Sequence, residues 1–189
     1  MTQQGKNAID MVLAESLIEL SAKKPIDKIT IKEITDKAGV IRPTFYNHFQ
    51  DKYELIEWII KTELLEPIKP LLNVGMIFEA IVLMLNNISA NSVFYKKALK
   101  LEGAVTFNQI AMKCVYEMFM NIIGEKSTGK KSKYRWLTPE VISTYYAQSL
   151  CFITEGWIAQ GMDDIEPKEM AEAYMYLITR SMDDILSEL

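Results

Sequence analysis

The spacing of apolar residues is the feature that most constrains the fold of this chain. Apolar side chains recur at the i, i+3, i+4 spacing of a helix along almost the whole sequence, and no stretch alternates like a strand over more than a few residues. With 189 residues, 49% of them apolar, the chain can bury a sizeable core without disulfides or a structural metal. The sequence therefore predicts an all-α protein.

Capping and breaking residues divide this pattern into two parts. The first part consists of short helices up to Pro67, and the fourth of these begins at a second capping box formed by Asp51 and Glu54. A helical body follows, with helices predicted over 75–89, 92–102, 106–123, 139–160 and 167–188. We expect an N-terminal domain at 1–52 and a C-terminal domain at 53–189.

Residues 30–52 have the layout of a helix-turn-helix. Thr30 and Glu33 form a capping box that opens one short helix, and Gly39 then permits the tight turn to the next. The second helix begins around Arg42, with Pro43 in its first turn, and is predicted to turn Phe45 and Phe49 towards the core. A helix with a polar outer face after such a turn is typical of a recognition helix that enters the DNA major groove.

The same residues resemble a known family. AGV at 38–40, TFYNHF at 44–49 and DK at 51–52 are similar to the signature of TetR/AcrR-family transcriptional regulators. A weaker likeness, in residues 157–172, is to the branch of activators of dihydroxyacetone kinase operons. The resemblance implies an N-terminal helix-turn-helix DNA-binding domain and a C-terminal helical domain that binds ligand and dimerises.

The resemblance also implies roles for individual side chains in binding a double-stranded DNA operator. Base contacts fall to Arg42, Pro43 and Asn47, and phosphate contacts to Thr44, Tyr46, His48 and Lys52, with Lys32 as a further candidate for either. An arginine can hold guanine by two hydrogen bonds, and a proline can contact a thymine methyl group. Lys52, at a helix N-terminus, would add its charge to the helix dipole that attracts phosphate.

Two positions in the motif leave alternatives open. His48 either faces DNA or is a partly buried structural histidine. Ile41 stands where many family members have a serine that caps the recognition helix, and losing such a cap costs about 0.5–2 kcal/mol. This departure bears on the geometry of Arg42, and so on the base contacts more than on the phosphate contacts.

The body is rich in aromatic and methionine side chains, which either fill the core or line a ligand cavity. The candidates for the cavity are Phe78, Met84, Phe94, Tyr95, Phe107, Met112, Tyr116, Phe119, Phe152 and Trp157. We expect a small apolar or amphipathic effector there to move the fourth helix, residues 52–66, which continues from the DNA-binding motif.

One short recognition helix makes too few contacts for useful specificity, so we expect a homodimer that addresses two half-sites. The helices at 139–160 and 167–188 are predicted to form its four-helix interface, with Val141, Ile142, Tyr145, Ser149, Phe152, Ile153, Tyr174, Leu177, Ile178 and Ile185, and with Ala147 and Ala159 allowing close approach. The alternative function is a co-activator or interaction protein of the same architecture that binds DNA weakly or not at all.

Several other classes are excluded or disfavoured by composition. No acid-base pair, nucleophile-base set or metal cluster emerges around the single histidine, so we predict neither an enzyme nor a bound metal or cofactor. The loop at 124–132 approaches the phosphate-binding GxxxxGK[ST] pattern, but Lys131 takes its Ser/Thr position, which predicts a solvated basic loop. Unpaired Cys114 and Cys151, and the lack of a signal peptide or spanning helix, predict a cytoplasmic protein away from membranes.

Overall fold

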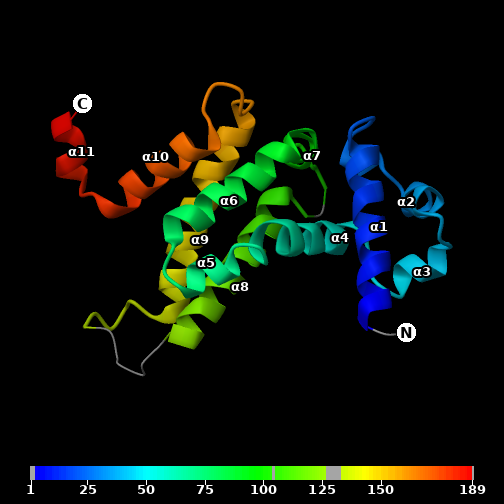
Figure 1. The fold of residues 1–189 in the computed structure, drawn as a ribbon, viewed down its shortest axis with the longest axis horizontal. Coiled ribbons are helices and arrows are strands. Elements are labelled where there is room, and N and C mark those ends of the chain that lie inside the picture. Colours follow the sequence, from blue (N-terminus) through cyan, green and yellow to red (C-terminus); the bar gives the residue numbers. More distant parts are fainter. Residues whose placement is uncertain (1–2, 104, 127–132, 189) are drawn as a thin grey trace.

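The computed structural model describes residues 3–103, 105–126 and 133–188, and every regular element in these ranges is helical. The predicted all-α class is therefore confirmed. Figure 1 shows a head formed by the first three helices at one side of the molecule, a larger helical body, and a C-terminal helix at the opposite end. We use "head" for α1 to α3 and "body" for the helical elements from residue 60 to α10.

The head contains four elements: α1 (Gln3–Ser21), the 3-10 turn η1 (Ile26–Lys28), α2 (Ile31–Ala38) and α3 (Arg42–Tyr46). The predicted capping box opens α2, since the Thr30 amide donates to Glu33 Oε2 over 2.9 Å and the Glu33 amide donates to Thr30 Oγ1 over 3.3 Å. Gly39 ends α2 with a φ of 70°, as the predicted turn requires. Local sequence signals thus set the geometry of the helix-turn-helix.

A single helical path leads from the head into the body. α4 (Lys52–Ile59) begins at Asp51, whose side chain accepts from the amides of Tyr53 and Glu54. The expected capping box is changed in one detail, because the Glu54 carboxylate accepts from the Gln50 amide rather than from that of Asp51. From residue 60 the path continues as a π-helical segment, η2 (Ile60–Leu65), where the sequence predicted an uninterrupted α-helix.

The body is built from five further helices around the core. They are α5 (Lys69–Asn73), α6 (Ile77–Ala90), α7 (Ser92–Ala98), α8 (Phe107–Lys126) and α9 (Pro139–Ala159), and α10 (Pro167–Thr179) packs across them. α8 lies along α9, and α6 lies against α10 and η2. Buried side chains of the head and body belong to one continuous core, and its head portion includes Leu13, Leu17 and Phe45.

The last predicted helix is interrupted. Residues 167–188 form two helices, because Arg180 is extended (φ −108°, ψ 150°) and α11 (Met182–Glu188) starts after it. Ser181 caps the new helix, since its hydroxyl donates to Asp184 Oδ2 and accepts from the Asp184 amide. α11 projects away from the body in Figure 1.

Two further predictions concern the remaining segments. The basic loop at 124–132 lies for the most part outside the described residues, since α8 extends to Lys126 and 127–132 are not described.

Within the described part of the chain, no single helix combines the length and apolarity of a membrane span. α6 and α7 reach that threshold only as a pair, and they are bent by 88° at their junction.

Candidate nucleic-acid interface and ligand cavity

α3 has a buried face that fixes its position in the head. Phe45 is 0% exposed and Phe49, just after the helix, is 4% exposed, as predicted. Their ring centroids lie 5.8 Å apart, and Phe49 also meets Trp58 of α4 edge-on at 6.3 Å. This aromatic row joins the recognition helix to the helix that enters the body.

The opposite face of α3 is open. Arg42, Pro43, Tyr46 and Asn47 are exposed, and Thr44 is half-buried. The Arg42 guanidinium lies 3.5 Å from the Tyr46 hydroxyl and forms no ion pair with any described residue. Of the predicted contact side chains, those on α3 and Asn47 after it are therefore at least partly accessible to solvent, with the cation Arg42 at the N-terminus of the helix.

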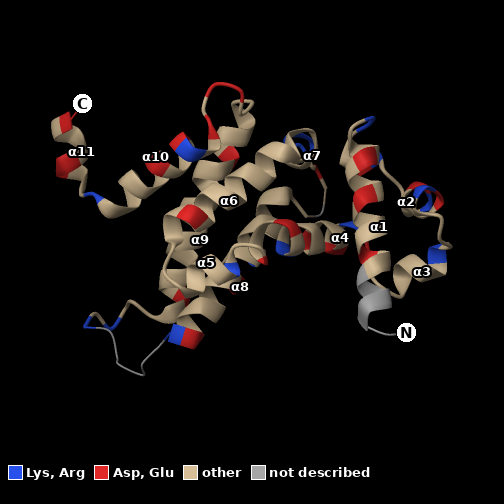
Figure 2. Ribbon diagram, viewed as in Figure 1, with Lys and Arg blue, Asp and Glu red and all other residues tan. Residues whose placement is uncertain are grey.

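Charge in the head is distributed unevenly around α3. Figure 2 shows basic residues at the start of α3 and in the loop after α1, both basic and acidic residues on α2, and acidic bands on the described part of α1. Lys32 is exposed on α2 and pairs with Asp36 at 2.6 Å, and this hydrogen bond raises the pKa of Lys32. The hydrogen bonds from Lys24 and from Thr30 lower the pKa of Glu33 to about 2. The α2–α3 side is thus the one suited to face phosphate.

His48 does not face outward, contrary to the expected phosphate contact. Its side chain is 2% exposed, and its Nδ1 lies 2.6 Å from Oδ1 of Asp10, which is 7% exposed. The pair joins the segment after α3 to α1, so the structural role is the one that the geometry supports. The described residues hold no group of three or more His, Cys, Asp or Glu arranged to bind a metal ion.

Lys52 is also occupied by structural contacts. Its ammonium donates to three backbone carbonyls, of Ile26 (3.0 Å), Asp27 (2.7 Å) and Ile29 (3.3 Å). An ammonium has three donors, so all of them are used in holding η1 against the start of α4. Burial lowers the pKa of Lys52. The structure therefore contradicts a free, phosphate-facing Lys52, and sequence reasoning missed these carbonyls because they lie more than 20 residues away.

Ile41 leaves the N-terminus of α3 without the side-chain cap that a serine would provide, as predicted. Ile41 occupies the N-cap of α3 with extended backbone (φ −86°, ψ 153°), makes no side-chain hydrogen bond to the helix, and is 69% exposed. Pro43 lies in the first turn, where its missing amide hydrogen costs nothing. α3 is nonetheless helical from Arg42, so the helix forms without a side-chain cap.

An ion-pair cluster connects the path from the head with α8. Glu57 of α4 pairs with Lys61 of η2 at 2.7 Å and with Lys113 of α8 at 2.8 Å, and Lys61 also reaches Glu117 at 2.8 Å. Burial opposes ionisation of Glu57, but the hydrogen bonds from Lys113 and Lys61 hold its pKa below the ordinary value. Four charges thus tie the α4–η2 junction to the body. Only the Glu57–Lys61 pair, at the i, i+4 spacing, can be read from the sequence, because Lys113 and Glu117 come from the distant α8.

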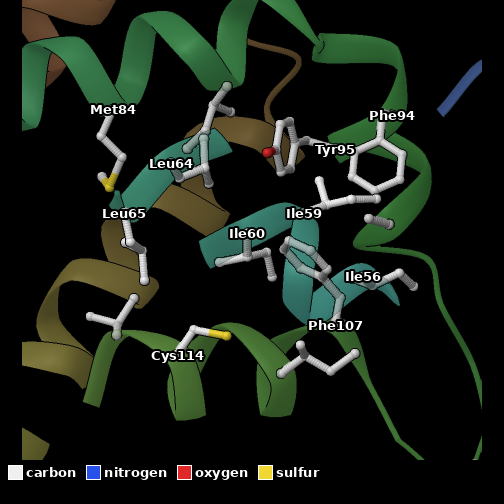
Figure 3. Packing of buried hydrophobic residues seen from close by; sticks show 14 of the residues in the cluster. Ile56, Ile59, Ile60, Leu64, Leu65, Met84, Phe94, Tyr95, Phe107 and Cys114 are labelled. Carbon is white, nitrogen blue, oxygen red and sulfur yellow. The ribbon is translucent and has the colours of Figure 1, made fainter. Parts of the chain in front are cut away.

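The body contains two neighbouring apolar cavities. The smaller, about 40 Å³, is lined by η2, α6, α7, α8 and α9, and Figure 3 shows part of its surroundings, with Ile60 and Leu64 of η2 near Tyr95. The larger, about 400 Å³, lies between α6, α8, α9 and α10. Met84 and Leu150 line both. A volume of 400 Å³ falls in the range of roughly 300–1,000 Å³ that is usual for small-molecule sites.

The predicted cavity residues divide into three groups. Met84, Tyr95 and Phe107 line the smaller cavity, and Met84 and Phe119 line the larger one. Phe152 and Trp157 instead border a separate surface groove next to α7 and α10, with Phe152 77% exposed. The other four line neither cavity: Phe94 is buried in the core, and Phe78, Met112 and Tyr116 pack against it.

Some of the side chains predicted to form the dimer interface are instead buried within their own chain. Tyr145 and Phe152 on α9 and Leu177 on α10 are exposed at 62%, 77% and 47%. Ala147 and Tyr174 are buried against their own chain at 0% and 3%, and so are not available to a second copy. Helical spacing alone did not separate these two sides of α9 and α10.

Together, the fold and the outward surface of α3 define a helix-turn-helix DNA-binding protein with a helical C-terminal domain. Residues 15–59 match the family described as "Bacterial regulatory proteins, tetR family", and residues 76–180, more than half of the chain, match its "Transcriptional regulator C-terminal region". The chain belongs to the TetR family and is a DNA-binding transcriptional regulator.

Similar proteins have regulatory roles. DhaS of Lactococcus lactis subsp. lactis (strain IL1403), the HTH-type dhaKLM operon transcriptional activator, is 26% identical over 152 residues, which is 79% of each chain. The solved structure of a dihydroxyacetone kinase operon activator DhaS is 21% identical, with a TM-score of 0.63 over 90% of this chain and 93% of that one. NalD, the secondary repressor of the MexAB-OprM multidrug efflux pump in Pseudomonas aeruginosa, is 12% identical, with a TM-score of 0.59 over 92% and 96%.

Proposed function

We propose that this regulator acts as a homodimer that reads its operator with α3 and is controlled by a small molecule bound in the body. The observation that carries the proposal is the two-sided α3, which is anchored by Phe45 and presents Arg42, Pro43 and Asn47 to the outside. We place the boundary between the DNA-binding and C-terminal domains at residue 52, where α4 begins.

Each outward side chain has a role that follows from its chemistry. Arg42 would hold guanine through two hydrogen bonds, Asn47 would hold adenine, and Pro43 would contact a thymine methyl group. Thr44, Tyr46 and Lys32 would contact phosphates and set the orientation of the head. His48 and Lys52 are left out of this set, because both are held by contacts within the head.

The dimer would form through the exposed surface of α9 and α10. Tyr145, Phe152 and Leu177 are large apolar side chains in water on this surface, which supports its burial by a second copy. Two heads related by a two-fold axis would address half-sites about 34–36 Å apart, or at a related spacing.

The switch would act through η2 and α4. Ile60 and Leu64 of η2 line the smaller cavity, and α4 continues from them towards the aromatic row under α3. Irregular π segments are often found at functional sites in helices. A ligand shifts the spacing of the heads only if it binds one arrangement more tightly than the other, so contacts with η2 are the relevant ones.

The test is a gel-shift titration with DNA from upstream of the chain's own gene and, as a second probe, from upstream of a dihydroxyacetone kinase operon. Arg42→Ala should cost about 1–3 kcal/mol of binding free energy and relax sequence preference. Lys32→Ala should weaken all sites alike and reduce the salt slope by about one. If the two variants behave identically, the assigned roles are wrong, and sedimentation as a monomer at working concentration would contradict the dimer.

A second candidate function is a co-activator or interaction protein of the same architecture with weak DNA binding. The observation that favours it is the uncapped N-terminus of α3 at Ile41, which lowers the stability of the short helix that must read bases. Absence of specific retardation with either DNA probe, together with an intact fold, would favour this candidate.

A further inference from the structure

Two hydroxyl groups in the smaller body cavity have no hydrogen-bond partner among the described residues. They are the Tyr95 hydroxyl on α7 and Thr154 Oγ1 on α9, and both residues line the cavity. Tyr95 is 1% exposed, and burial raises the pKa of its phenol, which therefore stays protonated as a donor. Buried polar groups are nearly always hydrogen-bonded, so a pair of orphaned hydroxyls at one cavity requires an explanation.

The surroundings of these hydroxyls are apolar. Figure 3 shows the Tyr95 hydroxyl directed towards the side of Leu64, with Ile59 and Ile60 nearby. Each hydroxyl can donate one hydrogen bond and accept others. One small polar group between α7 and α9 could therefore satisfy both, and a hydroxyl or a carbonyl has the required acceptor capacity.

The volumes of the two cavities indicate where the polar and apolar parts of such a molecule would fit. About 40 Å³ holds little more than a terminal polar group, whereas the adjoining cavity has about 400 Å³ of apolar space. Met84 and Leu150 lie between the two and line both. Methionine is flexible and adapts to what packs against it, so a chain can pass from one cavity into the other.

The charge of the lining selects an uncharged molecule. Among the described residues, neither cavity is lined by Lys, Arg or His, so an anionic group would be buried without a counter-charge. Glu155 is the one carboxylate among the described lining residues, and it accepts from Asn108 Nδ2 at 2.6 Å. A cation would have this single counter-charge in an otherwise apolar lining, so it is less disfavoured than an anion.

We propose that the effector is an uncharged, elongated amphipathic molecule whose terminal hydroxyl or carbonyl is held between Tyr95 and Thr154, with its apolar part in the larger cavity. This inference rests on the proposed function and adds the chemical class of the ligand. Its polar end lies against Ile60 and Leu64, where contact reaches η2 and α4.

The experiment is calorimetric titration of the full chain with a series of linear 1-alkanols from butanol to dodecanol, and with the acid and amine of the same length as the best alcohol. We expect an alcohol to bind more tightly than either charged analogue. Tyr95→Phe and Thr154→Val should each weaken alcohol binding about tenfold, which corresponds to ~1.4 kcal/mol. Tyr116→Phe is the matched control, because Tyr116 is a partly buried tyrosine that lines neither cavity, and it should leave the affinity unchanged.

Three results would overturn the inference: no alkanol binds, the acid or the amine binds as tightly as the alcohol, or both cavity variants keep wild-type affinity. Gel shifts on the same variants without alcohol separate this result from a failure of the proposed function. Wild-type chain that retards DNA but binds no alkanol overturns only the ligand class. Alcohol binding that depends on Tyr95, in a chain without specific DNA binding, overturns only the proposed DNA-reading role.

Discussion

The head and the body differ in the partners of some of their polar groups. In the head, His48 is paired with Asp10, and Lys52 at the start of α4 donates to three carbonyls of the head. In the body, Tyr95 and Thr154 keep hydroxyls without partners among the described residues, next to apolar cavities.

This difference fits the two tasks of a regulator. Base contacts need a recognition helix held in one geometry, and a fully satisfied polar network favours a single arrangement of α1, α3 and α4. A ligand site instead needs groups whose hydrogen bonds are completed by the ligand. Removing the paired groups should therefore destabilise the head, whereas removing the unpartnered hydroxyls should leave the stability of the body unchanged or increase it.

The largest effect should come from the aromatic anchor of the head. Phe45→Ala removes a side chain that is 0% exposed and leaves a cavity, so the free energy of unfolding should fall by about 3–5 kcal/mol. Urea denaturation followed by circular dichroism measures this. Ile41→Ala, at an exposed position of the same motif, should change it by no more than about 0.5 kcal/mol. Equal losses in both variants would show that the head is not held by this anchor.

The buried pair in the head should give the next largest loss. Asp10→Ala and His48→Ala each leave the other group buried without its partner, at a cost of about 1–3 kcal/mol. In a double-mutant cycle the combined loss should be smaller than the sum, with a coupling of roughly 0.5–3 kcal/mol. Asn47→Ala, next in sequence but exposed, should leave stability unchanged and reduce DNA affinity. Additive losses would contradict a direct interaction between Asp10 and His48.

In the body, removing an unpartnered buried hydroxyl should not lower the free energy of unfolding. Without ligand, Tyr95→Phe removes a buried hydroxyl that has no partner, so stability should stay the same or rise by about 1 kcal/mol. Tyr174→Phe is the matched control: it is also buried, but its hydroxyl is not among the buried atoms without a partner, and its loss should cost about 0.5–1.5 kcal/mol. Thermal unfolding measures the stability of both variants. A clear destabilisation by Tyr95→Phe would show that this hydroxyl has a partner, and that the head and the body do not differ in this respect.

The parts of the fold that depend on neighbouring residues were predictable from the sequence. The capping box of Thr30 and Glu33, the turn at Gly39 and the inward face of α3 all follow from residues within a few positions of each other. Ser181 and Asp184 carry an equally local cap signal that marks the break before α11, and it was missed in favour of one long helix.

Contacts between distant segments were not predictable in the same way. His48 and Lys52 belong to a motif whose pattern favours DNA contact, but packing brought Asp10 and the carbonyls of η1 against them. The π segment and the ion pairs of Glu57 depend on how α4 meets α8. Helical periodicity states which residues share a face and does not state which neighbour covers that face.

The smallest predicted effect concerns the uncapped start of α3, where the head lacks a hydrogen bond it could have. Ile41→Ser offers a side-chain acceptor to the Thr44 amide, which already donates to the backbone carbonyl of residue 41 over 2.9 Å, while Pro43 has no amide hydrogen to donate. Little packing is lost because Ile41 is 69% exposed. Stability should therefore rise by only about 0.5 kcal/mol relative to Ile41→Ala, the low end of the range for a cap, measured by urea denaturation. Operator affinity should rise in parallel if the stability of α3 limits base reading. A gain in stability with no gain in affinity would show that α3 is already formed in solution, and would remove the main support for a co-activator with weak DNA binding.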